Sequence, residues 1–487
     1  MVDKLKLDWI TLASEADYLY RSPNIKGGMI YSSEGNKVCD LVNKIIREEY
    51  ESEGFSIWSF SNRVSRKDLD IISESISNEM DSSFNNSVHW IFRNHDLSRV
   101  NVIKEALRPS GESQIYPFWA NFINSYRQLP DVGRIMLQQR FFRVPQKGHR
   151  STTRLESDVS EGHALFETLD EANLAMNRYL IVCESIADLV GIPYVSVESP
   201  IWDNSHFNER SSYLCSIMDD SVRLFASAYN QGTNLSEKFG IKYNDKNGRM
   251  MVPHIADWGI GLFYPALWHN RDKNGFSLPF SITPFDIQLI SINNNPETLI
   301  YAEKISNLLL NSGYRVKFEP SSDLIKLRKS WELKGYPIRL EVGPIEISDK
   351  SCSIWHRWDV DNNYSPDVLQ LNNLLDHLSA SKQSQKKYLL AKNIEIKNNK
   401  IISTYNVDDL KNAVFNGYIG SFNWCNSRSC IEKLYGSKDS ITNKRVGGFV
   451  SIGKFLGWDF HKTESEKCVL CGSNSQKIGY WSRRRYI

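Results

Sequence analysis

Hydrophobic positions in the first half of the chain alternate between helical and strand-like spacing. The stretch 39–54 places its apolar residues on one helical face and ends in glycine, a common helix cap. A second helix is predicted over Leu169–Val190, with two acidic residues near its start and a glycine after its end. Tyr194–Val197 then predicts a strand. Many short apolar runs separated by turn signals fill 101–168 and 205–283, which indicates an antiparallel sheet with helices on one side, an α+β fold class.

The pattern changes near residue 284. Strands are predicted over 285–292, 314–319 and 336–343, and a helix over 296–313 lies between the first two. A further helix is predicted over Val368–Leu378. This order indicates an α/β domain built on parallel strands.

These changes predict three domains. Residues 1–283 form the α+β domain, 284–392 the α/β domain, and 393–487 a small C-terminal domain that contains paired cysteines.

The composition of this 487-residue chain is ordinary, with 41% hydrophobic and 24% charged residues. We find no apolar run long enough to span a membrane and no signal-peptide pattern, so we expect a cytoplasmic protein without a membrane partner. The net charge is only +2, so a nucleic-acid partner would require a local basic patch. Two such patches are the lysine-rich stretch Ser381–Lys400 and the three arginines near the end of the chain. A solvated surface is the alternative interpretation of both.

Four of the eight cysteines form two close pairs near the C-terminus, Cys425 with Cys430 and Cys468 with Cys471. Four thiolates in two pairs can surround one ion tetrahedrally, and a cytoplasmic chain has little use for disulfides. The spacing therefore predicts a structural zinc site with no open coordination position. Four reduced thiols without a metal are the alternative.

The stretch "WELKGYPIRLEVGP", residues 331–344, resembles the anticodon-binding domain of prolyl-tRNA synthetases, whose motif follows W-E-L-K-G-x-P-x-R-x-E-x-G-P. The family continues with Arg-Asp, where this chain has Ile345-Glu346. The resemblance implies binding of a proline-specific tRNA through the motif residues Trp331, Glu332, Lys334, Arg339 and Glu341.

Other segments extend the resemblance over nearly the whole chain. "LRPSGES", "SYRQLPD", "EGHALFETLDEA" and "NLSEKFGIKY" are similar to family motifs, and the cysteine pairs match the zinc-bearing tail of the archaeal and eukaryotic-type enzymes. The chain thus resembles a diverged paralogue of this family. The resemblance implies a class II synthetase-like antiparallel catalytic domain that pairs into a homodimer.

The amino-acid half of the implied active site is partly retained. The resemblance assigns substrate binding to Ser110, Glu112, Glu161 and His163. A carboxylate such as that of Glu112 suits the secondary ammonium of a proline-like ligand, because charge-assisted hydrogen bonds are strong. The alternative is that these polar residues only hold loops in place.

The ATP half departs from the family. Arg143 is the best match to the catalytic arginine of the second class II motif, and Arg140 is its rival. With Arg143 in that role, the adenine-reading glutamate is replaced by Pro145. A family histidine and glutamine further along correspond to Tyr229 and Thr233.

The third class II motif has lost its arginine. "ADWGIGLFYPALWH", residues 256–269, resembles the family's T-S-W-G-V-S-T-R, with Gly261, Leu262 and Phe263 in place of serine, threonine and arginine. Neutral residues cannot replace a guanidinium that clamps a phosphate. We therefore expect weak ATP binding, unless Arg271 substitutes.

The sequence leaves three functions open. The first is an enzyme that takes prolyl-tRNA as aminoacyl donor and passes the prolyl group to a small acceptor, without ATP-dependent activation. The second is an active proline–tRNA ligase with a remodelled nucleotide site. The third is a non-catalytic tRNA- or amino-acid-binding regulator.

Overall fold

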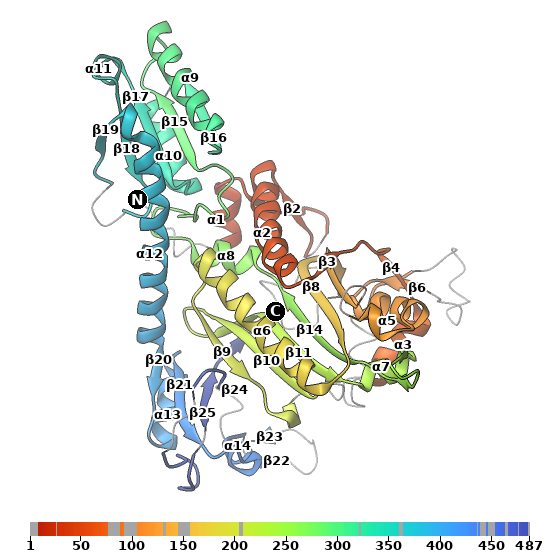
Figure 1. Cartoon of the computed structure of the whole chain (residues 1–487). Coiled ribbons are helices and arrows are strands. Elements are labelled where there is room, and N and C mark those ends of the chain that lie inside the picture. The colour runs from red at the N-terminus through yellow and green to blue at the C-terminus, as the bar shows by residue number, and fades with distance from the viewer. Residues whose placement is uncertain are drawn as a thin grey trace. The chain divides into compact units, whose positions relative to one another are not determined.

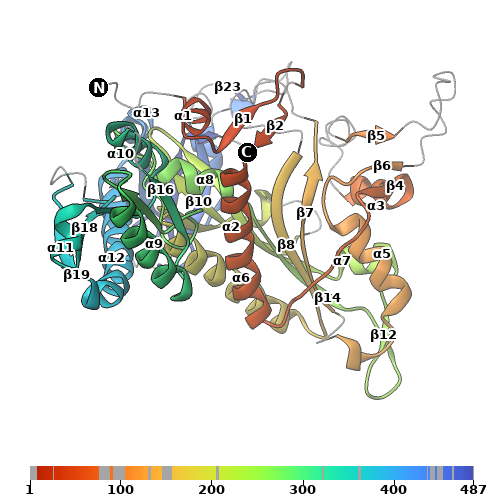
Figure 2. The same ribbon diagram turned by 90° about the horizontal axis from the view of Figure 1, so that it is seen from above.

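The computed structural model describes residues 8–25, 27–75, 88–91, 105–129, 133–144, 156–203, 208–320, 323–359, 364–435, 437–438, 445–446, 453–462, 466–475 and 477–485. The chain divides into two compact units. Unit 1 comprises Met1–Ile45, Ala187–Ile192 and Phe263–Asn393, and unit 2 comprises Ile46–Ile186, Pro193–Leu262 and Ile394–Ile487. Figures 1 and 2 show the elements of both units from two sides.

A 12-stranded sheet organises unit 2. Its strand order is β20-β21-β25-β24-β9-β10-β11-β14-β8-β7-β3, and β26 pairs with β11. Most neighbours are antiparallel, as the sequence predicted; β20 with β21, β3 with β7 and β26 with β11 are parallel. The strands are β3 (Ser56–Ile57), β7 (Arg134–Phe142), β8 (Glu156–Phe166), β9 (Tyr194–Glu198), β10 (Arg210–Ile217), β11 (Val222–Gly232), β14 (His254–Ile260), β20 (Ile401–Ser403), β21 (Ile419–Trp424), β24 (Lys454–Asp459), β25 (Lys477–Ser482) and β26 (Arg484–Arg485).

Helix α6 (Leu169–Val190), which has the predicted bounds, lies across this sheet (Figure 1). Arg210 on β10 donates to the side chains of Asn173 and Asn177 on α6, at 3.1 and 3.2 Å. The first predicted helix is α2 (Ser33–Ser52), which begins earlier than its apolar stripe indicated. The predicted strand near residue 194 is β9, one residue longer than expected.

The strands of the cysteine-bearing C-terminal region continue the large sheet. Trp458 and Asp459 on β24 pair with Glu198 and Val197 on β9. The described part of 394–487 therefore belongs to unit 2. The three predicted domain boundaries stay a prediction.

An apolar core of unit 2 lies where α5 (Glu112–Phe122) and α7 (Asn234–Phe239) pack beside β7, β8 and β14. The remaining short elements of unit 2 are β4 (Arg63–Ser65), α3 (Arg66–Ser75), β5 (Trp90–Ile91), β6 (Glu105–Leu107), η3 (Tyr126–Gln128), η4 (Ile201–Asp203), β12 (Tyr243–Asn244), β13 (Met250–Met251), α13 (Val407–Phe415), α14 (Arg428–Tyr435), β22 (Ser437–Lys438) and β23 (Arg445–Val446).

Unit 1 contains a five-stranded sheet of order β16-β15-β17-β18-β19. Strands β15, β16 and β17 are parallel, as predicted. Strand β18 pairs antiparallel with β17, and β19 pairs antiparallel with β18 at the edge of the sheet. The elements of this domain are β15 (Ile287–Ser291), α9 (Pro296–Asn311), β16 (Val316–Pro320), α10 (Leu324–Lys334), β17 (Ile338–Val342), α11 (Pro344–Ser348), β18 (Ser351–His356), β19 (Asp367–Gln370), η5 (Leu371–Asn373) and α12 (Leu374–Lys400).

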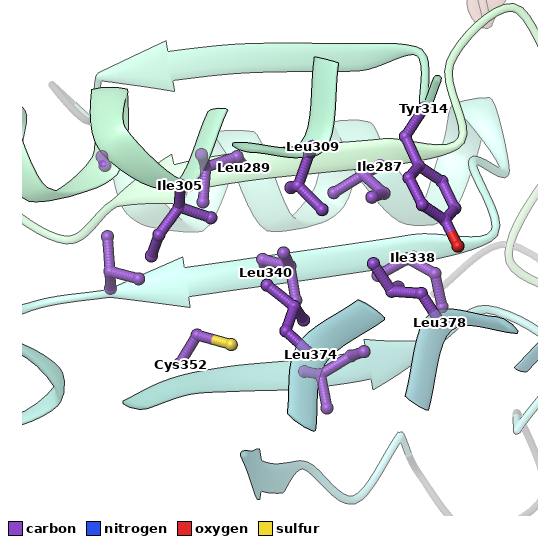
Figure 3. Packing of buried hydrophobic residues seen from close by; sticks show 13 residues of the cluster. Ile287, Leu289, Ile305, Leu309, Tyr314, Ile338, Leu340, Cys352, Leu374 and Leu378 are labelled. Atoms are coloured by element: carbon purple, nitrogen blue, oxygen red, sulfur yellow. The ribbon is translucent and has the colours of Figure 1, made fainter. Parts of the chain in front are cut away.

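Both faces of this sheet are covered. The apolar side chains of β15 and β17 pack against α9 and α12, and Figure 3 shows Ile305, Leu309, Leu374 and Leu378 gathered around them. The alternate residues of β17, Arg339 and Glu341, contact α10 on the opposite face. The remaining elements of unit 1 are α1 (Trp9–Glu15), β1 (Leu19–Arg21), β2 (Met29–Tyr31) and α8 (Phe263–His269).

The helix predicted over Val368–Leu378 was wrong in its first half. Val368 lies in β19, where it pairs with Ser353 on β18, and α12 begins only at Leu374. Pairing with the exposed edge of β18 prevailed over the helical spacing of the apolar residues in this stretch. Among the described residues, no helix is long and apolar enough to cross a membrane.

Candidate functional site

A cluster of polar side chains is buried in unit 2 between the start of α5 and the strands β8, β11 and β14. Glu161 and His163 are two residues apart on β8, so their side chains share one face. Asp257 on β14 pairs directly with His163. Glu112 begins α5, and Gln231 lies near the end of β11.

A chain of hydrogen bonds connects the cluster. The Tyr116 hydroxyl lies 3.0 Å from His163 Nδ1 and donates to Gln231 Oε1, also at 3.0 Å. Gln231 Nε2 in turn donates to Asp257 Oδ2. His163 Nε2 lies 3.6 Å from Glu161 Oε1. The Tyr116 hydroxyl orients the imidazole through Nδ1, and the Glu161 carboxylate lies near its other nitrogen atom.

Three buried polar atoms of the cluster have no hydrogen-bond partner among the described residues: Glu112 Oε2, Glu161 Oε1 and His163 Nε2. Unpartnered buried polar groups are costly, so they are uncommon unless a ligand or water pairs with them. Gly111 makes room for this arrangement, since a Cβ there would lie 1.9 Å from Glu161 Oε1. Three carboxyl groups lie around one imidazole, an excess of acidic groups that is complementary to a cationic ligand.

The charges of the cluster perturb one another. Burial lowers the pKa of His163, but the Glu161 carboxylate 3.6 Å away and the charges of Asp257 and Glu112 together raise it to about 9. Burial raises the pKa of Asp257, His163 lowers it, Glu112 and Glu161 raise it, and the hydrogen bond from Gln231 lowers it; together these place it at about 8. Strong perturbation of two facing groups is typical of functional sites.

The structure brings together three of the four residues predicted to bind the amino acid: Glu112, Glu161 and His163. Ser110 lies in the turn before α5, where its carbonyl oxygen accepts a hydrogen bond from Ser113 Oγ at 3.2 Å. The assignment of all four to substrate binding stays a prediction.

Sequence reasoning missed Tyr116, Gln231 and Asp257. Asp257 carried a usable signal, because it occupies the serine position of the T-S-W-G motif and places a carboxyl group in an otherwise apolar strand. Tyr116 and Gln231 had no such signal in the sequence. Tyr116 reaches the cluster only because of how α5 packs, and Gln231 only because of the register of β11.

The two candidate catalytic arginines differ in their contacts. Arg140 on β7 forms ion pairs with Glu156 at 2.9 Å and Asp158 at 3.1 Å on β8. Arg143, just after β7, is exposed and donates from Nε to the Pro109 carbonyl oxygen at 2.8 Å. Arg140 is thus paired with two carboxylates, whereas the hydrogen bond given for Arg143 is to a backbone carbonyl oxygen. Pro145 lies outside the described residues.

The residues at the expected phosphate-clamp position are apolar and buried. Leu262 is 1% and Phe263 4% exposed. Within unit 1, the Phe263 ring lies 5.1 Å from that of Tyr31. Arg271 stacks on Trp268, with its guanidinium 3.8 Å from the ring centroid, and donates to the Trp268 carbonyl oxygen at 3.1 Å.

Three of the five residues predicted to bind tRNA are buried between α10 and β17. Trp331 is 0% exposed, and the guanidinium of Arg339 lies 4.5 Å from its ring. Arg339 forms a 2.9 Å ion pair with Glu341, and Arg328 donates from Nε to the same carboxylate at 2.8 Å. This burial supports a structural contribution, and a direct contact with tRNA remains a prediction.

The other two residues of that set lie at the end of α10. Lys334 Nζ lies 2.9 Å from the Glu34 carboxylate. The Glu332 carbonyl oxygen accepts a hydrogen bond from the buried Arg357 at 3.0 Å. Their predicted contact with tRNA is likewise untested.

The four C-terminal cysteines converge as predicted, with all four Sγ atoms within 4.8 Å of one another. Cys425 Sγ lies 3.6 Å from those of both Cys430 and Cys471. Two thiolates about 2.3 Å from a tetrahedrally coordinated zinc ion are about 3.8 Å apart, so the donor set fits such an ion. Gly472, with φ of 75°, closes the turn after Cys471. The cluster could therefore hold a metal, and its identity as zinc stays a prediction.

Comparisons with known proteins agree with this architecture. A family model described as an anticodon binding domain matches residues 286–379. The proline–tRNA ligase of Thermoplasma volcanium is 26% identical over 480 residues, covering 97% of this chain and 96% of that protein. That of Sulfurisphaera tokodaii is 26% identical over 491 residues, covering 97% and 95%.

Among solved structures, the prolyl-tRNA synthetase of Cryptosporidium parvum, in complex with L-proline and AMP, superposes with a TM-score of 0.83. Sequence identity is 20%, and the match covers 100% of this chain and 96% of that one. This match confirms the predicted fold class.

We predict that Cys468→Ser removes bound zinc. Wild-type protein dialysed against zinc-free buffer should retain close to one zinc ion per chain by elemental analysis, because four thiolates fill the coordination sphere. The variant should retain little. Cys39→Ser, on α2 and outside the cluster, is the control and should retain wild-type zinc. A wild-type protein without zinc after reducing purification would contradict the assignment.

We predict that Asp257→Asn flattens the pH dependence of stability. The pKa of Asp257 is about 8, against an ordinary value of 3.8, and that of His163 is about 9, against 6.5. The folded state thus holds these protons more tightly than the unfolded state, so the free energy of unfolding should fall as pH rises from about 4 to 9. Urea denaturation followed by tryptophan fluorescence should show a smaller fall in the variant. The control Asp245→Asn, in an exposed turn, should follow the wild type; an equally steep fall in Asp257→Asn would contradict the assignment.

Proposed function

Because the chain belongs to the prolyl-tRNA synthetase family, we propose that it binds tRNA and a proline-like aminoacyl group but is impaired in ATP-dependent activation. In this proposal it takes the prolyl group from prolyl-tRNA and transfers it to a small acceptor. The observation that carries the proposal is the excess of carboxyl groups around His163, of which Glu112 and Glu161 each have a buried oxygen without a hydrogen-bond partner among the described residues. A cytoplasmic location is part of the same proposal.

The carboxyl-rich pocket suits the ammonium end of such a ligand. A secondary ammonium has two N–H donors, and Glu112 Oε2 and Glu161 Oε1 are two buried acceptors that lack a hydrogen-bond partner among the described residues, although Glu161 Oε1 lies 3.6 Å from His163 Nε2. Hydrogen bonds between ionised groups are about twice as strong as neutral ones. The charged imidazole, which the raised pKa of His163 favours, lies with Nε2 3.6 Å from the same Glu161 oxygen and shares that carboxylate.

The expected phosphate side lacks matching donors. A triphosphate next to Leu262 and Phe263 would bury charge without a partner, which costs several kcal/mol even after relaxation. Asp257 adds a further carboxyl group to the buried pocket at a position where the family motif has serine. Both changes favour a cation over a polyphosphate.

Transfer from prolyl-tRNA needs no phosphate chemistry, because the ester is already activated. A nucleophilic atom of the acceptor attacks the prolyl carbonyl carbon, the bond to the ribose oxygen breaks, and the acceptor proton passes to that oxygen. The protein contributes chiefly by holding the reactants together. Arg143 is the candidate catalytic residue, since its exposed guanidinium can pair with the carbonyl oxygen as negative charge develops.

We expect a homodimer, as the family resemblance implies. Light scattering at micromolar concentration should then give about twice the 56.1 kDa mass of the chain. A mass equal to that of one chain would contradict this part of the proposal.

We expect tRNA binding to depend on the lysines of α12. Lys386 and Lys387 are exposed on this helix. Each lysine that contacts a phosphate releases counterions, so Lys386→Ala with Lys387→Ala should weaken binding and reduce the slope of log affinity against log salt by about 2. Filter binding over a salt series would measure both. Lys304→Ala, exposed on α9, is the control and should leave the slope unchanged. Equal affinity for tRNA and for random RNA of the same length would contradict a specific tRNA partner.

Two assays test the substrate pocket and the loss of activation. Proline-dependent pyrophosphate exchange should be near background in the wild type, and Phe263→Arg alone should not restore it, because the other departures remain. Glu112→Gln should weaken calorimetric binding of L-prolinamide about tenfold or more, since a hydrogen bond to a charged group contributes about 1.5–3 kcal/mol. Glu237→Gln, exposed on α7, should have no effect.

The outcomes separate the three functions. Robust exchange by the wild type would restore the active proline–tRNA ligase. Unchanged ligand binding in Glu112→Gln would overturn the proposed pocket. Tight binding of ligand and tRNA without transfer to any acceptor in a small-molecule extract would favour a regulator.

A further inference from the structure

A second group of metal-ligand side chains lies in unit 1, in the domain built on the five-stranded sheet. His356 ends β18, Asp367 begins β19 and His377 lies in the first turn of α12. One ligand atom of each residue lies within 4.8 Å of those of the other two. This group contains no cysteine and shares no residue with the proposed aminoacyl or tRNA sites.

The register of the sheet explains why these side chains meet. His356 pairs with Ile338 of β17, and Asp367 pairs with Ile354 of β18. Ile338 and Ile354 belong to the apolar core under α12, so His356 and Asp367 lie on that same covered face. His377 immediately precedes Leu378, which packs into the core. Three separate elements thus bring ligand-type side chains to one edge of the core.

The spacing of the two imidazoles matches shared coordination. Their Nε2 atoms are 3.3 Å apart. Two nitrogen atoms about 2.0–2.1 Å from a tetrahedrally coordinated zinc ion are about 3.3–3.4 Å apart. The Asp367 carboxylate supplies a third ligand, and its exposed position leaves the remaining coordination to solvent.

A hydrogen-bond partner competes with a metal ion for His356. Its Nε2 atom lies 2.9 Å from Ser381 Oγ, so binding of an ion through Nε2 would replace this hydrogen bond.

We propose that His356, Asp367 and His377 form a binding site for a divalent transition-metal ion, with zinc as the ion best suited to two imidazoles and one carboxylate. The bound ion joins β18, β19 and the start of α12. It therefore fixes the edge strand β19, whose residues are mostly exposed, to the core of the domain. The site is separate from the four-cysteine cluster.

Equilibrium dialysis of the full chain against a zinc buffer at about micromolar free Zn²⁺, followed by elemental analysis, tests this site. The wild type should hold one more zinc ion per chain than His377→Gln or Asp367→Asn. The matched control Asp376→Asn removes an exposed carboxylate from the neighbouring position of α12 and should bind as much zinc as the wild type. Circular dichroism in EDTA should show that all variants are folded.

Co²⁺ provides a second readout that distinguishes the two sites. The proposed site should give visible d–d bands without the near-ultraviolet thiolate band, and these bands should persist in Cys468→Ser and disappear in His377→Gln. Equal zinc content in the wild type, His377→Gln and Asp367→Asn would overturn the proposal and leave the histidine pair as a hydrogen-bonded contact. Loss of binding in Asp376→Asn would overturn the assignment of Asp367.

Discussion

The pairing of β8 with β14 constrains the whole of unit 2, because it brings Glu161, His163 and Asp257 together inside an apolar sheet. Buried ionisable groups destabilise a fold unless they are paired, and here the carboxyl groups outnumber the imidazole. The surroundings must then hold the cluster in place, and the Tyr50–Trp258 stack, with ring centroids 3.4 Å apart, packs the strand next to Asp257. Gly162 is needed in that packing, since a Cβ there would lie 2.4 Å from the Trp258 indole nitrogen. The cluster destabilises the fold, yet the packing around it holds it in place, and binding of a ligand would account for both.

The sequence predicted those elements whose pattern lies within one short segment. The spacing of apolar residues predicted helix α6 and strands β15 and β17, and the spacing of the cysteine pairs predicted that they converge. Two kinds of feature could not be found this way. Strand β19 exists because β18 offers an unpaired edge, and α10 has a mixed surface because its buried side faces charged residues. The roles of Tyr116 and Gln231 depend on the register of distant strands, which no local pattern reveals.

Strand β17 shows why alternation can mislead. Ile338 and Leu340 alternate with Arg339 and Glu341, which is typical of a strand with one solvated face, yet every residue of β17 is buried. The charged face is satisfied internally, by the Arg339–Glu341 ion pair and by the stacking of Arg339 on Trp331 and Trp355. The residues of the motif that carries the strongest family resemblance therefore stabilise the fold of this domain. The tRNA proposal depends more on exposed lysines of α12 than on that motif.

The family resemblance implies changes in the same direction on both sides of the active site. By that resemblance Glu112 and Glu161 match carboxylates of the family, whereas the apolar, buried Leu262 and Phe263 occupy the position where a phosphate clamp is expected. One oxygen each of Glu112 and Glu161 lacks a hydrogen-bond partner among the described residues, which destabilises the fold unless a ligand or water pairs with it. The carboxylates favour a cation and the apolar residues disfavour a polyanion, so both sides agree with the proposal of a site for an amino group.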